Sequence, residues 1–237
     1  MPEPLSGAGR LAAVVPAAVS TAEAFGDLEP LHAFEAEAEL VAGVVESRRR
    51  EFLTARRCAH QALAGLGRTP VPVGRGRDRA PVWPPGVVGS ITHCDGYRAA
   101  AVAEYGDVLA LGIDAEPHRD LAPGVAELVL RPAEAHRLAD LRRHEPGAAW
   151  PTLVFCAKEA LYKAWYPMTR RWLDFHDVEV TIDPARHAFV GHVLAADAPR
   201  SEFSGRYHFD DDLVVAAVVV GPARPTDPSA DTGKVNQ

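Results

Sequence analysis

The sequence contains two similar helical stretches, and each of them comes before a pair of β-strand signals. Residues 55–63, which read A-R-R-C-A-H-Q-A-L, align with residues 157–165, which read A-K-E-A-L-Y-K-A-W. An amphipathic helix must bury its apolar stripe, and a β-hairpin that follows it can supply the surface. The repeat favours an α+β fold with two similar halves joined near residues 111–117. Chance similarity between two alanine-rich helices is the alternative.

The first helical region is predicted over residues 37–67, because its apolar residues fall on one stripe that ends at two glycines. Its polar side carries Arg48 and Arg56, about 80° apart around the helix and roughly 12 Å apart along it, so that both can reach one extended polyanion. A solvated helix face is the alternative reading of these arginines. A loop rich in glycine and proline follows over residues 69–86 and carries Arg75.

The rest of the chain alternates between strand and helix signals. An Asp-Gly pair between two runs of β-forming residues predicts a hairpin over residues 87–103. We also expect strands at 11–15, 108–116, 178–182, 189–194 and 207–220, the last with a turn at 210–212, and a helical region at 121–143 that is split near Pro132. These elements divide into an N-terminal half (1–112), a C-terminal half (113–221) and a disordered tail (222–237).

The composition restricts the class of protein. The 237-residue chain has 47% hydrophobic residues and a formal net charge of −7, so it lacks the basic field that attracts nucleic acid. Its longest apolar runs are too short to span a membrane, and its N-terminus does not resemble a signal peptide. Three widely separated cysteines, Cys58, Cys94 and Cys156, indicate a reducing compartment. We therefore expect a cytoplasmic protein that binds neither nucleic acid nor membrane.

Lysine is rare in this chain, and two of its three lysines lie in one predicted helix. Lysine and arginine together number 25, but only Lys158, Lys163 and Lys234 are lysine. Unlike arginine, lysine is a compact charge that can release a proton, which suits contact with phosphate or a leaving group. Glu159 and Lys163 are four residues apart and share a helix face. An ordinary surface ion pair is the alternative.

Two carboxylates lie at the end of a predicted strand. Asp114 and Glu116 are two residues apart, so their side chains point to the same face. Adjacent carboxylates repel one another unless a cation lies between them, and Mg²⁺ takes few protein oxygens while it keeps room for water and phosphate. The solvated face of an edge strand is the alternative. His93, just before the hairpin turn, is an anion donor, a metal ligand or a satisfied core histidine.

Three motifs occur in an order that resembles one enzyme family. They read G-S-I-T-H-C at residues 89–94, G-I-D-A-E at 112–116 and F-C-A-K-E-A-L-Y-K at 155–163. Together they resemble the 4′-phosphopantetheinyl transferase superfamily over residues 40–220. The chain length and the internal repeat resemble the Sfp/EntD-type enzymes, which are monomers. The resemblance implies an α+β fold with two pseudosymmetric halves, each a helix on a small antiparallel sheet, and with the active site at their interface.

The resemblance also implies a reaction. The phosphopantetheine arm of coenzyme A would be transferred to a serine of an apo acyl or peptidyl carrier protein, with release of adenosine 3′,5′-bisphosphate. Asp114, Glu116 and Glu159 would hold Mg²⁺, and Glu159 would take the serine proton directly or through a water. Lys163 would offset charge on the pyrophosphate and the leaving group. Ala115 stands where some relatives have a polar residue, which suggests that water fills that metal position.

Further residues are carried over to the coenzyme A site. Arg48, Arg56 and His93 would hold the 3′-phosphate and adenine end, and the other expected contacts are Arg75, Ser90, Lys158 and Lys163. A Mg²⁺-dependent nucleotide phosphohydrolase and a non-catalytic coenzyme A-binding module stay as alternatives. An apo carrier protein discriminates between these functions, because only a transferase needs it.

Carrier docking requires a local basic and apolar patch, because the chain is acidic overall. The second half offers two such patches: Arg170, Arg171 and Trp172 in one, and Arg137, Arg142 and Arg143 in the other. We predict that Arg170 and Arg171 steer the carrier. Fatty-acid, polyketide and nonribosomal-peptide carriers are equally open as partners at this point.

Overall fold

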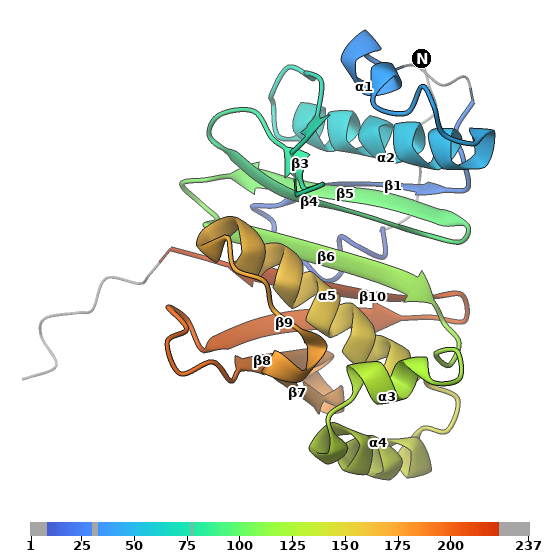
Figure 1. Ribbon diagram of the computed structural model, residues 1–237, viewed down its shortest axis with the longest axis vertical. Helices are drawn as coiled ribbons and strands as arrows, with labels where there is room; N and C mark the ends of the chain where they lie inside the picture. The colour runs from blue at the N-terminus through green and yellow to red at the C-terminus, as the bar shows by residue number, and fades with distance from the viewer. Residues whose placement is uncertain (1–8, 30–32, 77, 223–237) are drawn as a thin grey trace, which may run out of the picture.

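The protein consists of two helix-on-sheet halves that lie side by side. The computed structural model describes residues 9–29, 33–76 and 78–222. In Figure 1 one helix lies over a three-stranded sheet in the upper half, and a second helix crosses a five-stranded sheet in the lower half. The predicted α+β fold with two similar halves is confirmed.

The upper half packs helix α2 (Glu46–Gly65) on an antiparallel sheet with the strand order β1-β5-β4. Its strands are β1 (Ser20–Phe25), β5 (Tyr97–Glu104) and β4 (Val87–Cys94). Strands β4 and β5 pair along their whole length, so the predicted hairpin is confirmed. Gly96 at its turn has a φ of 72°, a conformation that glycine adopts without steric cost.

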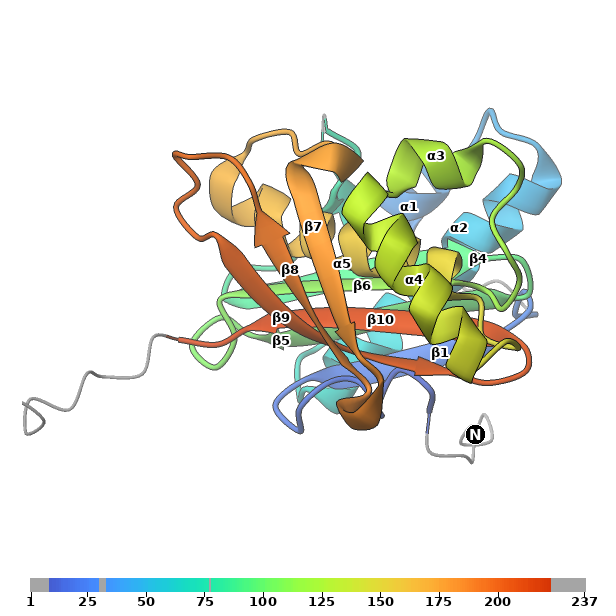
Figure 2. The ribbon, with the colours of Figure 1, turned by 90° about the horizontal axis from the view of Figure 1, so that it is seen from below.

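The lower half packs helix α5 (Trp150–Thr169) on an antiparallel sheet with the order β6-β10-β9-β8-β7. Its strands are β6 (Ala110–Pro117), β7 (Val178–Asp183), β8 (Ala188–Val193), β9 (Glu202–Phe209) and β10 (Leu213–Val220). Two shorter helices, α3 (Val125–Val129) and α4 (Pro132–His144), lie at one end of α5 (Figures 1 and 2). The split near Pro132 is as predicted, since proline at the first helical position loses no hydrogen bond. Short 3₁₀ helices at Phe175–Asp177 and Pro184–Arg186 flank β7.

The two halves meet where β4 lies beside β6 (Figure 1). Hydroxyl groups of β4 bond to the backbone of β6 along this seam. Ser90 Oγ accepts a hydrogen bond from Ile113 N at 3.1 Å, and Thr92 Oγ1 accepts one from Ala115 N at 3.2 Å. Residues two apart on a strand face the same way, so this Ser-x-Thr spacing fixes β6 against the upper half.

One hydrophobic core, which includes residues of β5, β6 and β10, is shared by both halves. Buried residues of β5, β6 and β10 pack there with Leu11, Val14 and Val19 of the N-terminal segment. The strand predicted at 11–15 is wrong, because these residues form turns and the first strand is β1. Leu11 and Val14 are three residues apart and both buried, a spacing that a turn brings to one side and a strand does not.

Helix boundaries differ from the prediction in two places. Residues 37–67 contain two helices, α1 (Glu35–Glu39) and α2, separated by a turn that includes Gly43. Glycine within a helix costs about 1 kcal/mol relative to alanine, which favours the break. A proline and two arginines predict a turn over residues 167–171, but helix α5 continues two residues past Pro167, where the missing N–H costs one backbone hydrogen bond in the last turn. The predicted loop at 69–86 contains a small ribbon, β2 (Gly74–Arg75) and β3 (Pro81–Val82).

The cysteines, the helices and the boundaries of the two halves bear on further sequence predictions. All three cysteines are buried and carry free thiols. Within the described part of the chain, no helix is both long and apolar enough to cross a membrane. The tail predicted at 222–237 lies outside the described residues from 223 onward. The boundary placed between residues 112 and 113 stays a prediction, and it falls inside β6, which pairs with β10 along its whole length.

Candidate active site

Helix α5 contacts β6 at one point with no side chain between them. A Cβ atom at Gly112 would lie 1.9 Å from the carbonyl oxygen of Ala160, which is far inside contact distance. Only glycine permits this approach of backbone to backbone. The crossing brings the helix face with Glu159 and Lys163 to the strand that carries Asp114.

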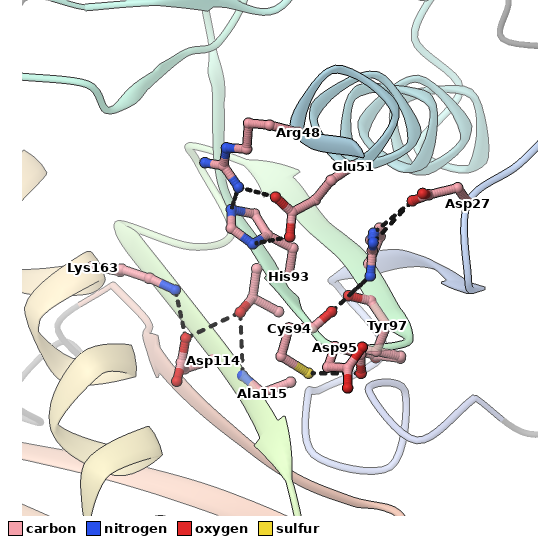
Figure 3. Close-up of polar contacts among 12 residues, drawn as sticks. Asp27, Arg48, Glu51, His93, Cys94, Asp95, Tyr97, Asp114, Ala115 and Lys163 are labelled. Carbon is pink, nitrogen blue, oxygen red and sulfur yellow. Dashed lines mark hydrogen bonds and ion pairs between the residues drawn. The ribbon is translucent and has the colours of Figure 1, made fainter. Parts of the chain in front are cut away.

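Asp114 is the centre of the contacts at this crossing (Figure 3). Its Oδ1 accepts hydrogen bonds from Lys163 Nζ at 2.7 Å and from Thr92 Oγ1 at 3.0 Å. Lys163 also donates to the Ile113 carbonyl at 3.0 Å. Strand β4 therefore holds Asp114 from one side and helix α5 holds it from the other, so both halves meet in the contacts of one carboxylate.

Carboxylate charge accumulates around Asp114. Its second oxygen, Oδ2, is buried and has no hydrogen-bond partner among the described residues, a costly state for an ionised group. Burial, followed by the charge of Asp114, raises the pKa of Glu116 to about 7. The same two causes raise the pKa of Glu159. The charge of Asp114 thus opposes the ionisation of both neighbouring acids, and a bound cation would relieve that repulsion.

These residues fit a divalent cation, although they do not form a closed cage. Among the described residues, no group of three or more His, Cys, Asp or Glu side chains is arranged to hold a metal ion. The best donors are Oδ2 of Asp114 and the carboxylate of Glu116, both on β6. Two hard oxygens leave the remaining positions to water and phosphate, as Mg²⁺ prefers. Glu159, on α5, is close enough to interact with Asp114, and its predicted role as a third ligand stays a prediction.

A second polar cluster lies at the start of α2 (Figure 3). Arg48 and Glu51, one helical turn apart, form an ion pair, and His93 near the end of β4 lies against both. His93 Nδ1 is 3.0 Å from Glu51 Oε1, and Nε2 is 3.2 Å from Arg48 Nη1. Burial lowers the pKa of His93, Glu51 opposes this effect, and Arg48 adds to it. The structure thus brings together two of the predicted anion-binding residues and adds an acid between them.

A cleft of about 820 Å³ lies between the halves, within the usual range for a small-molecule site. Ser90 and Lys163 line it, and most of its wall is apolar, with Trp83, Ile91 and Tyr166 among the larger side chains. The wall joins β4 and the β2–β3 ribbon of the upper half to α5 of the lower half. A ligand in this cleft would contact both halves.

Comparison with known proteins identifies the family. Residues 36–103 match a model of the 4′-phosphopantetheinyl transferase N-terminal domain, and residues 110–218 match the 4′-phosphopantetheinyl transferase superfamily. The chain is 43% identical to 4′-phosphopantetheinyl transferase Npt of Nocardia iowensis over 86% of this chain and 97% of the relative. It is 42% identical to Svp of Streptomyces mobaraensis over 93% and 94% of the two chains, and 40% identical to PptT of Mycobacterium tuberculosis over 89% and 97%.

The chain belongs to the 4′-phosphopantetheinyl transferase superfamily. The predicted family and the predicted activity, 4′-phosphopantetheinyl transfer, are confirmed by these relatives. None of the comparisons tests which residues of this transferase perform the reaction, so the geometry of its own side chains decides what can be proposed for each.

Lys158 of the transferase lies away from the cleft. Its side chain is 2% exposed, and Nζ donates to Glu134 Oε2 at 2.7 Å, to the Val129 carbonyl at 2.8 Å and to the Phe175 carbonyl at 2.9 Å. An ammonium group has three donors, and all three are used within the protein. The expected contact between Lys158 and coenzyme A does not fit this geometry. Consecutive helical residues point about 100° apart, so Lys158 and Glu159 face different surroundings.

Arg56 is also placed differently from the expectation. It is 5% exposed, its Nε donates to the Val73 carbonyl at 2.8 Å, and its guanidinium packs over the ring of Phe52. Burial lowers its pKa to about 10. Arg56 does not lie on an exposed polar helix face, because the segment that leads into β2 covers its side chain. Arg75, on β2, is exposed and lies close enough to Arg56 to contribute to this lowering of its pKa.

Sequence reasoning missed three residues that shape the site. Thr92 and Gly112 lie inside the recognised motifs, and the signals for them were the alternation with Ser90 along a strand and the glycine that opens G-I-D-A-E. Glu51 lies outside the motifs, and its signal was the i,i+3 spacing from Arg48 on a helix. Only the fold shows that His93 joins that pair.

Proposed function

We propose that this transferase moves the phosphopantetheine arm of coenzyme A to a serine of an apo acyl or peptidyl carrier protein, at the seam between its halves. The observation that carries the proposal is the buried, unpaired oxygen of Asp114 beside the Lys163 ammonium. Lys163 lines a cleft of ligand size, and the Asp114 carboxylate lies directly behind it at 2.7 Å. A pyrophosphate with a bridging cation is the group that suits both.

The acids of β6 provide the metal site in this proposal. Asp114 and Glu116 would hold Mg²⁺, and Glu159 would complete the set directly or through a water. When bound, the ion neutralises the pyrophosphate of coenzyme A and the charge that develops on it during transfer. Thr92 and Lys163 hold Asp114 through Oδ1 and leave Oδ2 for the metal.

Glu159 and Lys163 perform the proton and charge steps. The raised pKa of Glu159 makes it a better proton acceptor at neutral pH, so it removes the proton of the carrier serine. The serine oxygen bonds to the β-phosphorus, and the bond from that phosphorus to the bridging oxygen of adenosine 3′,5′-bisphosphate breaks. Burial opposes the charge of Lys163, but Asp114 and Glu159 outweigh burial and raise its pKa. Lys163 therefore stays protonated and stabilises the leaving bisphosphate.

Coenzyme A lies across the seam. Arg48 and His93 bind its 3′-phosphate through charge-assisted hydrogen bonds, and Arg75 contacts the nucleotide from β2. Ser90 supports this site by holding β6, and Arg56 supports it by bonding the segment that leads to Arg75. The pantetheine arm extends along the apolar wall of the cleft.

The carrier docks beside the C-terminal end of α5. Trp172 is 74% exposed there and packs on Tyr162 at 5.3 Å between ring centroids. The neighbouring arginines are already paired, Arg170 with Asp78 at 3.1 Å and Arg171 with Asp197 at 2.9 Å. An exposed aromatic side chain with arginines at its rim suits an acidic, partly apolar partner.

We also propose that the enzyme acts as a monomer in the cytoplasm. One chain supplies residues of both halves to the cleft, which supports a monomeric enzyme. Three buried free thiols suit a reducing compartment.

The test is incubation of the protein with coenzyme A, MgCl₂ and several apo carrier proteins, followed by intact-mass measurement of each carrier. We expect at least one carrier to gain a phosphopantetheine group, and EDTA or a serine-to-alanine carrier to prevent the gain. Bisphosphate release without any carrier would indicate a phosphohydrolase. Binding of coenzyme A with neither release nor transfer would indicate a non-catalytic module.

A further inference from the structure

Glu51 occupies an unexpected position for an acid. It lies between Arg48 and His93, the two residues to which the 3′-phosphate is assigned above. At a separation of a few ångströms, a fixed negative charge repels a phosphate by about 1 kcal/mol or more, even in a watery surface site. A side chain that only added its charge to this site would weaken the binding of coenzyme A.

The contacts of Glu51 suggest what it contributes. One carboxylate oxygen hydrogen-bonds to Arg48 Nη1, and the other lies at ion-pair distance, 3.0 Å, from His93 Nδ1. Arg48 and His93 come from α2 and β4, which are separate elements, and Glu51 is the acid that contacts both. A carboxylate has two acceptor oxygens, so it can hold both donors at once.

The same contacts define the tautomer of His93. Arginine has only donors, so the Nε2 atom that faces Arg48 at 3.2 Å is an acceptor, and the ring hydrogen lies on Nδ1 towards Glu51. A phosphate oxygen is itself an acceptor and needs a hydrogen on Nε2. Since Glu51 keeps Nδ1 as a donor, His93 must carry two ring hydrogens, and hence a positive charge, when it binds phosphate.

We propose that Glu51 is a positioning residue that holds Arg48 and His93 as a pair of donors for the 3′-phosphate and allows His93 to take up a proton as the phosphate binds. This inference rests on the phosphate site assigned in the proposed function. The charged groups that affect the pKa of His93 most are Glu51 and Arg48 from α2, Lys163 from α5 and Arg98 from β5. Of these four, only Glu51 favours the protonated ring.

The first test measures coenzyme A binding by calorimetry without a carrier, in wild type, Glu51→Ala and Glu51→Gln. We expect Glu51→Ala to raise the Kd for coenzyme A roughly 10-fold or more, because the charge-assisted hydrogen bond to Arg48 and the ion-pair contact with His93 are lost together. Glu51→Gln should lie between the two, because its single carbonyl oxygen can hold one donor. Simple charge repulsion predicts the opposite sign, so a Kd that falls or stays the same in Glu51→Ala overturns the inference.

The matched control is Glu46→Ala. Glu46 lies on the same helix and pairs with Arg49 at 3.5 Å with the same i,i+3 spacing, but it has no contact with His93. We expect this variant to bind coenzyme A as wild type does. An equal loss of binding in both variants would mean that the effect is not specific to the acid that contacts His93, and the positioning role would be rejected. Thermal unfolding of each variant shows whether it is folded. If Glu51→Ala is misfolded, the comparison is made with Glu51→Gln.

Dephospho-coenzyme A separates this inference from the proposed function. Glu51→Ala should not change the Kd for this ligand, which lacks the 3′-phosphate. If wild type binds both ligands equally well, the phosphate site itself is wrongly assigned. If wild type prefers coenzyme A and Glu51→Ala keeps that preference, only the role of Glu51 is wrong.

Proton uptake provides a readout that a purely structural residue would not change. At pH 8 the 3′-phosphate, with a second pKa near 6, is already a dianion, so a proton taken up with it enters the protein. Calorimetry in two buffers of different ionisation enthalpy should show more proton uptake with coenzyme A than with dephospho-coenzyme A. That difference should disappear in Glu51→Ala. Equal uptake with both ligands in wild type would overturn the proton step.

Discussion

Lys158 and Lys163 lie five residues apart on α5, and their surroundings give them different roles. Lys158 is paired with Glu134 in a fully buried site that joins α3, α4 and α5, whereas Lys163 is partly exposed at the cleft. Removing one partner of a buried ion pair leaves the other charge uncompensated, at a cost of about 3–5 kcal/mol. We expect Lys158→Met to lower the free energy of unfolding by about that amount in urea, without raising the KM for coenzyme A.

Lys163→Met is the matched control for this substitution. It should lose transfer activity while it loses less stability than Lys158→Met, because the Lys163 side chain lines the cleft and is 27% exposed, whereas that of Lys158 is buried. A higher KM for coenzyme A in Lys158→Met, with stability unchanged, would restore Lys158 to the substrate site.

Glu116 gives a prediction for stability against pH. Its pKa is raised from 4.5 to about 7 by burial and Asp114, so its ionisation costs stability as pH rises through that interval. In EDTA, we expect the free energy of unfolding of wild type to fall between pH 5 and pH 8. The fall should exceed that of Glu116→Gln by about 1–2 kcal/mol, after allowance for solvent screening. Mg²⁺ added at pH 8 should raise the Tm of wild type by about 2–4 °C for each kcal/mol regained. The same Mg²⁺ response in Glu116→Gln would contradict its assignment as a ligand.

At Gly112, strand β6, which carries Asp114 and Glu116, lies directly against helix α5, which carries Glu159. An alanine there would place its Cβ 1.9 Å from the Ala160 carbonyl, so α5 must move away from β6. We expect Gly112→Ala to cost about 1–3 kcal/mol of stability and to lower kcat by about 100-fold, because Lys163 and Glu159 move with the helix. Gly147→Ala, at a glycine with open space around it, is the control and should change neither quantity. Normal kcat in Gly112→Ala would show that this helix contact does not set the site.

Sequence patterns predicted most elements because their signals are local. The Asp-Gly turn, the helical stripe of α5 and the proline at the start of α4 each fix an element within a few residues. The N-terminal turns and the burial of Lys158 and Arg56 depend on what packs against them from distant parts of the chain. Periodicity carries no information on such partners, so it could predict a helix face but not which charged residue on that face is exposed.

The residues of the candidate site also divide into those with a signal in the sequence and those that depend on distant packing partners. The motifs identified Asp114, Lys163 and His93 because the combination and order of the three motifs resemble one enzyme family, although each residue alone has an ordinary structural alternative. Thr92 and Glu51 act on them through contacts between separate elements, β4 with β6 and α2 with β4. The contact of Thr92 with Asp114 arises only when the two halves are placed together, and the contact of Glu51 with His93 arises only when α2 packs beside β4 within the upper half.

At the scale of the whole molecule, the remaining question is where the carrier approaches. Each arginine of the second predicted patch is paired locally: Arg137 with Glu179, Arg142 with Asp120 and Arg143 with Asp140. Arg170 pairs with Asp78 across the halves and lines the cleft, so a change there would also affect coenzyme A. Arg171 and Trp172 lie beside the cleft without lining it, and they give the cleaner test of docking.

We expect Arg171→Glu combined with Trp172→Ala to raise the KM for the carrier, to leave the KM for coenzyme A unchanged and to flatten the response of the rate to added salt. Rim charges act mainly on the association rate, and salt at 0.1 M screens their attraction beyond about 10 Å. An exposed aromatic side chain adds apolar contact area. Arg186→Glu, at an exposed arginine paired with Asp183 on the same half, controls for the change of net charge. An unchanged carrier KM at low ionic strength would exclude this patch and leave residues 137–143 as the docking site to test next.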